Sequence, residues 1–176
     1  MEGRIVTKIY GCDPGSAGCI VELDFDTKAC RYLKLPWIEY KQEKILDVNK
    51  IAKAFPDLSK YPVWLEDVNS DPKWTHVTNF SFGRNHGQAM LFLYSFGHLN
   101  FVPPKSWQNN IYKRDKIKYK SAKDQTLAAF TALYPNFTYV ANRHEGFIDA
   151  YFIALYGMWR TGETTKPPSF SFSSAL

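Results

Sequence analysis

Three strand-like segments follow one another at the start of the chain, and this order constrains the fold more than any other feature. Residues 5–10, 19–23 and 29–34 are rich in apolar and β-branched side chains, and turns of glycine, proline and aspartate separate them. Short turns between consecutive strands favour an antiparallel meander. With 176 residues the chain has room for one such core, because a domain takes roughly 100 to 200 residues.

Helices and two further strands alternate along the rest of the chain. The spacing of apolar residues predicts helices over 43–55, 77–96, 106–112, 121–133 and 145–159, and short strands over 61–66 and 99–102. We therefore expect an α/β fold with a mixed five-stranded sheet, in which two parallel strands join the meander and helices flank both faces. Residues 1–160 would form this domain, and the Ser/Pro-rich residues 161–176 a flexible tail.

Cysteine usage and hydropathy favour a protein of the cytoplasm. Cys12, Cys19 and Cys30 are odd in number and lack Cys-x-x-Cys spacing, so buried thiols are expected rather than disulfides or a zinc site. No apolar run approaches the eighteen or so residues of a membrane span, and no membrane partner is expected. The N-terminal residues lead into the first strand without a signal-like apolar segment.

Basic residues gather in one segment. Residues 113–123 contain six cations and one anion, which accounts for the whole formal net charge of +5. Phosphates attract such a segment, and Tyr112 and Tyr119 beside it are able to lie against sugars or bases. A solvated lysine-rich turn explains the same run equally well. The six cations are Lys113, Arg114, Lys116, Lys118, Lys120 and Lys123.

Four carboxylates stand where the expected fold would bring them together. Asp13 and Glu66 end two strands, and open α/β sheets place their sites at the C-terminal ends of strands. Glu145 and Asp149 are four residues apart, so both would project from one face of a helix. Clustered carboxylates repel one another unless a cation holds them, and oxygen ligands favour Mg²⁺, with Mn²⁺ as a substitute. Two such ions would support hydrolysis of a phosphodiester.

Each acid also has an ordinary explanation when it is taken alone. Asp13 would form a turn, Glu66 would end a strand, and Glu145 would complement a helix N-terminus. Asp149 favours the joint explanation, because an unpaired carboxylate is costly in a helix that is apolar nearly all round. His144 is a further candidate ligand or general base, although a histidine at a helix entry more often only forms hydrogen bonds.

The motifs resemble those of RuvC-type Holliday-junction resolvases. Residues 11–18, Gly-Cys-Asp-Pro-Gly-Ser-Ala-Gly, are similar to the family's Gly-x-Asp-Pro-Gly opening, and residues 64–66 resemble its second acidic strand. Residues 82–87 resemble the glycine-bearing helix of phage and chloroplast members, and residues 102–107 resemble the Val-x-Pro-x-x-Trp-Lys stretch. Residues 144–157 resemble the closing helix, so that the resemblance extends from residue 5 to about residue 160.

This resemblance implies an RNase H-like fold, a homodimer, a divalent metal and paired nicks across a four-way DNA junction. Asp13, Glu66 and Asp149 correspond to family acids, and they are the expected catalytic residues and metal ligands. Some members carry an Asp or His three residues before the final acid, where this chain has a glycine, so Glu145 or His144 would serve instead. A phage or bacterial origin, and hence a bacterial or phage-infected host cytoplasm, is expected.

The resemblance also suggests which residues touch DNA. Trp74, Phe80 and Phe82 are candidates for stacking in an opened junction centre, although core packing is the favoured role of the two phenylalanines. Gln108 replaces the lysine of the family's Trp-Lys pair, so that lysine's role would pass to Lys105 or Lys116 or be absent. The DNA-binding candidates are Trp74, Arg84, Lys105 and the six cations Lys113, Arg114, Lys116, Lys118, Lys120 and Lys123.

Three other functions remain open on sequence alone. An RNase H-like nuclease that cuts flaps or RNA–DNA hybrids would use the same acids. A non-catalytic nucleic-acid-binding module would explain the basic segment without needing them. An actin-like kinase or ATPase also has an Asp-x-Gly turn after its first strand, but it needs a second lobe for which 176 residues leave no room.

Overall fold

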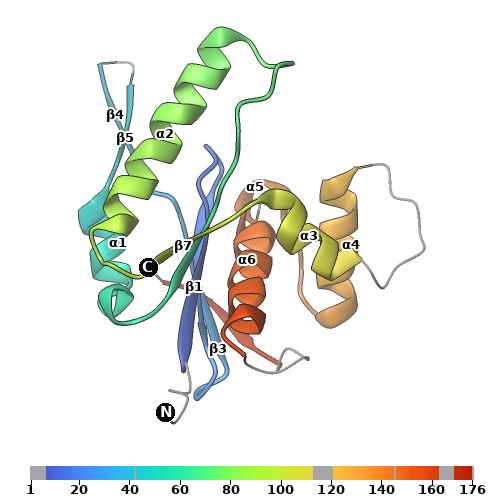
Figure 1. Cartoon of the computed structure of the whole chain (residues 1–176). Helices are drawn as coiled ribbons and strands as arrows, with labels where there is room; N and C mark the ends of the chain where they lie inside the picture. The colour runs from blue at the N-terminus through green and yellow to red at the C-terminus, as the bar shows by residue number, and fades with distance from the viewer. Residues whose placement is uncertain (1–6, 42, 113–120, 145, 163–168, 176) are drawn as a thin grey trace.

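A mixed β-sheet forms the centre of the computed structural model, which describes residues 7–41, 43–112, 121–144, 146–162 and 169–175 (Figure 1). Its strands are β1 (Lys8–Asp13), β2 (Cys19–Asp24), β3 (Ala29–Lys34), β6 (Val63–Glu66), β7 (Leu99–Val102) and β8 (Ser171–Ser174). They lie in the order β7-β6-β1-β2-β3-β8. β1 to β3 form the antiparallel meander, β6 is parallel to β1 and to β7, and β8 is parallel to β3. The expected mixed α/β sheet is confirmed, with a sixth strand added.

Helices cover both faces of this sheet (Figure 1). They are α1 (Val48–Ala54), α2 (His76–Tyr94), α3 (Pro104–Tyr112), α4 (Ala122–Leu133), α5 (Ala141–His144) and α6 (Phe147–Arg160), with a short 3-10 helix at Leu58–Lys60. α1 and α2 pack on one face, whereas α3, α4 and α6 pack on the other. As expected, the Ser121 side chain caps α4 by accepting a hydrogen bond from the backbone of Asp124. The helix expected over residues 145–159 begins at Phe147.

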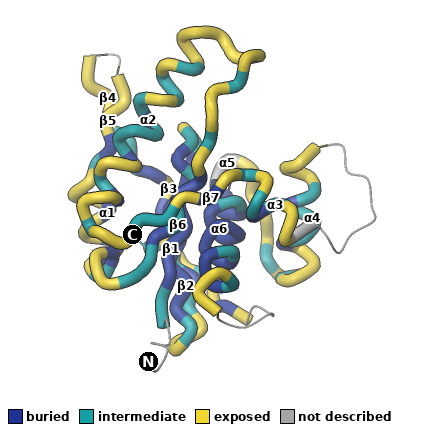
Figure 2. Tube along the Cα trace, in the orientation of Figure 1, coloured by how far each residue is buried: buried dark blue, intermediate teal, exposed yellow. Residues whose placement is uncertain are grey.

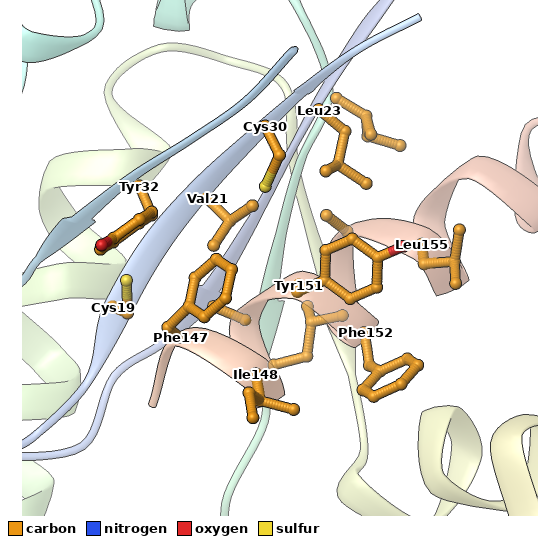
Figure 3. Close-up of a cluster of buried hydrophobic side chains, with 14 of the residues drawn as sticks. Cys19, Val21, Leu23, Cys30, Tyr32, Phe147, Ile148, Tyr151, Phe152 and Leu155 are labelled. Carbon is orange, nitrogen blue, oxygen red and sulfur yellow. The ribbon is translucent and has the colours of Figure 1, made fainter. Parts of the chain in front are cut away.

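Alternating side chains of the meander divide the core into two clusters. Val21 and its neighbours at two-residue spacing point toward α6, where Phe147 and Tyr151 meet them (Figure 3). Ile20 points the other way, toward α1 and α2. All three cysteines are free and buried in these clusters, as the sequence predicted. Among the described residues, no helix is long and apolar enough to cross a membrane.

The helix expected over residues 43–55 is only partly correct. Its first residues form β5 (Glu43–Leu46), which pairs with β4 (Trp37–Tyr40) in a separate antiparallel hairpin. Asp47 separates the two structures, because its side chain caps α1 by accepting a backbone hydrogen bond at 3.0 Å. Two isoleucines pair across the hairpin, and such β-branched pairs favour strands over a helix.

The expected flexible tail is wrong for residues 171–174, which form β8 at the edge of the sheet. Phe170 and Phe172 anchor this segment. Phe170 is buried against Phe25, and Phe172 lies in a cluster of aromatic rings that includes Phe130 on α4. The two phenylalanines are two residues apart and so share one face of an extended chain. The Ser/Pro-rich composition concealed this pattern.

Candidate active site

Two of the predicted acids stand side by side because β1 and β6 are parallel neighbours. Cys12 pairs with Leu65, so Asp13 and Glu66 follow at the same edge of the sheet. Asp13 also stabilises the turn after β1, since its Oδ1 accepts a hydrogen bond from the backbone N–H of Gly15 at 2.9 Å. The expectation that both carboxylates lie at the C-terminal edge of the sheet is therefore met.

Two glycines bring the start of α6 to this edge. Gly11 on β1 faces α6, and a Cβ there would lie 2.2 Å from the carbonyl oxygen of Ala150. Gly146 immediately precedes α6 with a φ of 74°, and a Cβ there would lie 3.0 Å from Oδ2 of Asp13. Only glycine permits both approaches. Asp149, in the first turn of α6, is thereby carried toward the two strand-end carboxylates.

Glu66 shows how strongly the acids affect one another. Its side chain is almost buried, and the indole N–H of Trp107 donates a hydrogen bond to its Oε1 at 2.8 Å. Burial, together with the charges of Asp13 and Asp149, raises the pKa of Glu66 to about 8, and the Trp107 hydrogen bond opposes this shift. Asp13 and Asp149 therefore lie near enough to Glu66 for their charges to raise its pKa.

The donor set fits a hard divalent cation. The three carboxylates offer only oxygen ligands. The raised pKa of Glu66 reflects burial first and then the negative charges of Asp13 and Asp149, and a cation would favour the charged form of Glu66 against both. Within the described part of the chain, no three His, Cys, Asp or Glu side chains stand at metal-binding distances. Glu145, the fourth predicted acid, lies outside the described residues. The assignment of metal ligands remains a prediction.

His144 is held as a packed side chain. It is 6% exposed, its Nδ1 accepts a hydrogen bond from the backbone N–H of Val140 at 3.0 Å, and its ring lies among Tyr32, Phe137 and Phe147. These contacts explain a structural role. They leave its predicted role as ligand or base untested.

A cavity of about 240 Å³ opens beside Asp149, between α4 and the start of α6. Leu127 and Ile148 give it an apolar lining, and Lys123 and Tyr139 also border it. Lys123, a predicted DNA-binding cation, thus borders the same cavity as the predicted metal ligand Asp149. Lys113, Arg114, Lys116, Lys118 and Lys120 lie outside the described residues.

The remaining DNA-binding candidates lie on three different segments. Lys105 is exposed in the first turn of α3. Arg84 on α2 forms an ion pair with Glu43 of the β4–β5 hairpin at 2.7 Å. Trp74, in the loop before α2, is 37% exposed and packs against Phe82. Phe80 is 70% exposed, so its expected core role is wrong in this chain: the turn of α2 that carries it extends past the sheet (Figure 2).

Two contacts to Glu66 were not predicted from the sequence. Trp107 stands out in the sequence only as part of a motif, and its hydrogen bond depends on α3 folding back against β6. His86 on α2 reaches the same residue, since its Nε2 lies 3.1 Å from the backbone oxygen of Glu66. For Trp107 and for His86, the sequence showed only that a side chain able to donate a hydrogen bond lies within an expected helix.

Comparison with known proteins supports the fold. No family model matches the sequence, and no curated protein matches it. Among solved structures, RuvC of T. thermophilus in complex with a Holliday junction substrate has a TM-score of 0.53 at 13% identity, covering 89% of this chain and 96% of that one. A second T. thermophilus RuvC structure has a TM-score of 0.46 at 13% identity, covering 88% and 96%. The first of these two structures shows that the chain has a RuvC-like fold.

Proposed function

We propose that this protein is a structure-selective endonuclease that resolves four-way DNA junctions by paired, metal-dependent hydrolysis of phosphodiesters. The observation that carries the proposal is the meeting of Asp13, Glu66 and Asp149, from three separate elements, at one edge of a RuvC-like sheet. The pKa of Glu66, raised to about 8, supports it further, because strongly perturbed carboxyls in a cleft are typical of active sites.

Asp13, Glu66 and Asp149 would hold Mg²⁺ or Mn²⁺, with Glu145 or His144 as a further ligand. Such ions supply an activated water and stabilise the leaving oxygen. The buried setting of Glu66 keeps bulk water away from one side of the site. Gly146 lets the turn between β1 and β2 pack closely against the start of α6, because a Cβ there would lie 2.4 Å from the carbonyl oxygen of Ala17 and 3.0 Å from Oδ2 of Asp13.

The substrate strand would enter along the cavity beside Asp149. Lys123 borders that cavity, and a lysine there would neutralise a phosphate next to the cut. Lys105 and the basic residues 113–120 would bind the duplex arms through phosphates, which gives affinity and register but little sequence preference. Trp74 lies just before α2 and the exposed Phe80 lies near the start of this helix, and both would stack on bases at the junction centre.

A second copy of the chain is expected to pack against α2. Ala89 and Leu93 on one side of this helix are buried in the core, whereas its other side exposes apolar residues. These exposed residues are Val77, Phe80, Met90, Leu91 and Tyr94. Gly83 and Gly87 lie on the same side, and a Cβ added at either would meet nothing within 4 Å. A contiguous apolar patch rarely stays in water, and two nicks on one junction call for two sites.

The test is a cleavage assay of the full chain on a four-way junction, a matched linear duplex, a flap and an RNA–DNA hybrid, each with Mg²⁺ and with EDTA. Symmetric nicks in the junction with Mg²⁺ alone are the expected result. Cutting of the flap or the hybrid instead would keep the chemistry and reassign the substrate. Tight binding of DNA without cutting under any condition would indicate a binding module.

A further inference from the structure

The indole of Trp107 contacts a predicted metal ligand from outside the acid cluster. Trp107 lies on α3 and is 1% exposed, and its N–H donates to Oε1 of Glu66 at 2.8 Å. α3 follows β7 directly, and β7 pairs with β6 up to Glu66 itself. The hydrogen bond therefore ties the carboxylate to an element that is anchored on the same edge of the sheet.

Burial alone does not account for this hydrogen bond. The indole nitrogens of Trp37, Trp64 and Trp159 are also buried, and none of the three has a hydrogen-bond partner among the described residues. This protein thus tolerates buried indoles without partners. Among the hydrogen bonds of the described residues, the one from Trp107 is the only one made to the Glu66 carboxylate, and it occupies a single oxygen.

Glu66 is fixed at its backbone as well. Nε2 of His86 on α2 lies 3.1 Å from the Glu66 carbonyl oxygen. Because a carbonyl oxygen only accepts, the imidazole ring donates this hydrogen bond. The next residue, Asp67, donates its backbone N–H to Val102 at the end of β7 at 2.9 Å. With the main chain held on both sides, the orientation of the carboxylate depends on its side-chain torsions, and the Trp107 hydrogen bond restrains them.

We propose that Trp107 is a positioning residue, which holds Oε1 of Glu66 and leaves Oε2 to ligate a divalent cation. This inference rests on the proposed metal-dependent function. A hydrogen bond from outside the ligand set orients a carboxylate ligand and lowers the cost of ordering it when the ion binds. The other oxygen then carries the interaction with the metal.

The test compares two tryptophan-to-phenylalanine variants of the full chain. Trp107→Phe keeps an aromatic ring and removes the N–H, whereas Trp64→Phe makes the same change on β6 at an indole without a partner among the described residues. Binding of Mn²⁺ is measured by calorimetry in the absence of DNA. We expect Trp107→Phe to weaken Mn²⁺ binding about 10- to 100-fold, and Trp64→Phe to leave it unchanged.

A second comparison separates positioning from packing. In a Glu66→Gln background, Trp107→Phe should cause no further loss of Mn²⁺ affinity, because the residue through which it acts is already altered. If Trp107→Phe does not fold, benzothienylalanine at position 107 retains the shape of tryptophan without the N–H and replaces it in both measurements. If the Mn²⁺ affinity is unchanged in folded Trp107→Phe, or in the benzothienylalanine variant that replaces it, the inference is overturned.

The Mn²⁺-binding test of Trp107 and the cleavage test of the proposed function can fail separately. A wild-type protein that binds Mn²⁺ but cuts no junction would refute the resolvase proposal, while the calorimetric comparison would still decide the role of Trp107. A wild-type protein that binds no Mn²⁺ at millimolar concentration would overturn both.

Discussion

Asp149 is the residue at which cutting and binding of DNA should separate most clearly. Asp149→Asn removes the charge of a proposed metal ligand, so we expect cleavage of a four-way junction to fall at least about 100-fold, beyond the loss typical of residues that only support ligands. Junction affinity should stay the same or increase, because one negative charge near phosphate is lost. Cleavage and gel-shift assays check both results.

Asp124→Asn is the matched control for this substitution. Asp124 borders the same cavity and is exposed, but it is not a predicted ligand. Its variant should cut at nearly the wild-type rate. Equal cleavage by both variants would remove Asp149 from the metal site.

Glu66 should make the stability of the metal-free protein depend on pH. Burial and then the charge of Asp13 raise its pKa from 4.5 to about 8, so the folded state binds the proton more tightly than the unfolded state. The stabilisation is then complete below about pH 4.5 and is lost as the pH rises toward 8. We expect the melting temperature in EDTA to fall across this interval.

Glu66→Gln tests the origin of that slope, since glutamine does not titrate. Its melting temperature should change less between pH 5 and pH 9 than that of the wild type. A slope as steep in the variant as in the wild type would assign the effect to other groups.

The sequence predicts the acids themselves better than their surroundings. Asp13, Glu66 and Asp149 stand at strand ends or within an apolar helix, and these positions are visible in the pattern of residues. The hydrogen bond from Trp107 and the contact of His86 join residues 41 and 20 positions apart from Glu66. Such contacts depend on how α3 and α2 pack, which no local pattern specifies.

At the scale of elements, the approach of α6 to β1 should be the least tolerant of added volume. In Gly11→Ala the new Cβ would meet the backbone of Ala150 at 2.2 Å and of Ala154 at 2.4 Å, and neither is a flexible side chain. Overpacking of this kind costs about 1 to 3 kcal/mol. We expect a lower melting temperature together with reduced cleavage, because α6 carries Asp149.

Gly83→Ala is the control, because nothing lies within 4 Å of its Cβ position on α2. Alanine favours a helix over glycine by up to about 1 kcal/mol, so this variant should be as stable as the wild type or more stable. A Gly11→Ala protein with wild-type stability would show that α6 is able to move away without cost.

β8 should contribute to stability although it lies at the edge of the sheet. Phe172→Ala removes a ring that lies 4.8 Å from Tyr134 and 5.7 Å from Phe130 between ring centroids. Full burial of a phenylalanine contributes about 1.5 to 3 kcal/mol. Phe172 is partly buried, so chemical denaturation should show a loss toward the lower end of this range. Ser173→Ala, at an exposed position of the same strand, should show none.

The β4–β5 hairpin and β8 show why some elements escape prediction. Over only four residues, the apolar side chains of residues 43–46 fit the spacing of a helix as well as that of a strand. Pairing with Trp37–Tyr40 decides in favour of the strand. β8 depends on the free edge of β3 and on an aromatic cluster built from distant helices. In both cases a contact remote in sequence outweighs local composition, whereas the longer helices α2 and α4 match their expected ranges closely.

At the scale of the whole molecule, the exposed side of α2 should determine the oligomeric state. Leu91 is 71% exposed and Tyr94 is 68% exposed at the end of a helix whose opposite side is buried in the core. Leu91→Glu places a charge within this patch without touching the core. Burying an unpaired charge in an interface is costly, so the variant should be monomeric at concentrations where the wild type is a dimer.

Sedimentation velocity over a range of concentrations measures this difference, and Leu133→Glu is its control. Leu133 is 41% exposed at the end of α4, on the other side of the sheet, so a charge there should leave the dimer intact. In the proposed mechanism a dimer is needed only to pair the two nicks, because each copy holds its own Asp13, Glu66 and Asp149. Leu91→Glu should therefore still nick a junction in one strand but lose simultaneous cutting of both. Wild-type protein that sediments as a monomer while it makes paired nicks would show that α2 serves another partner.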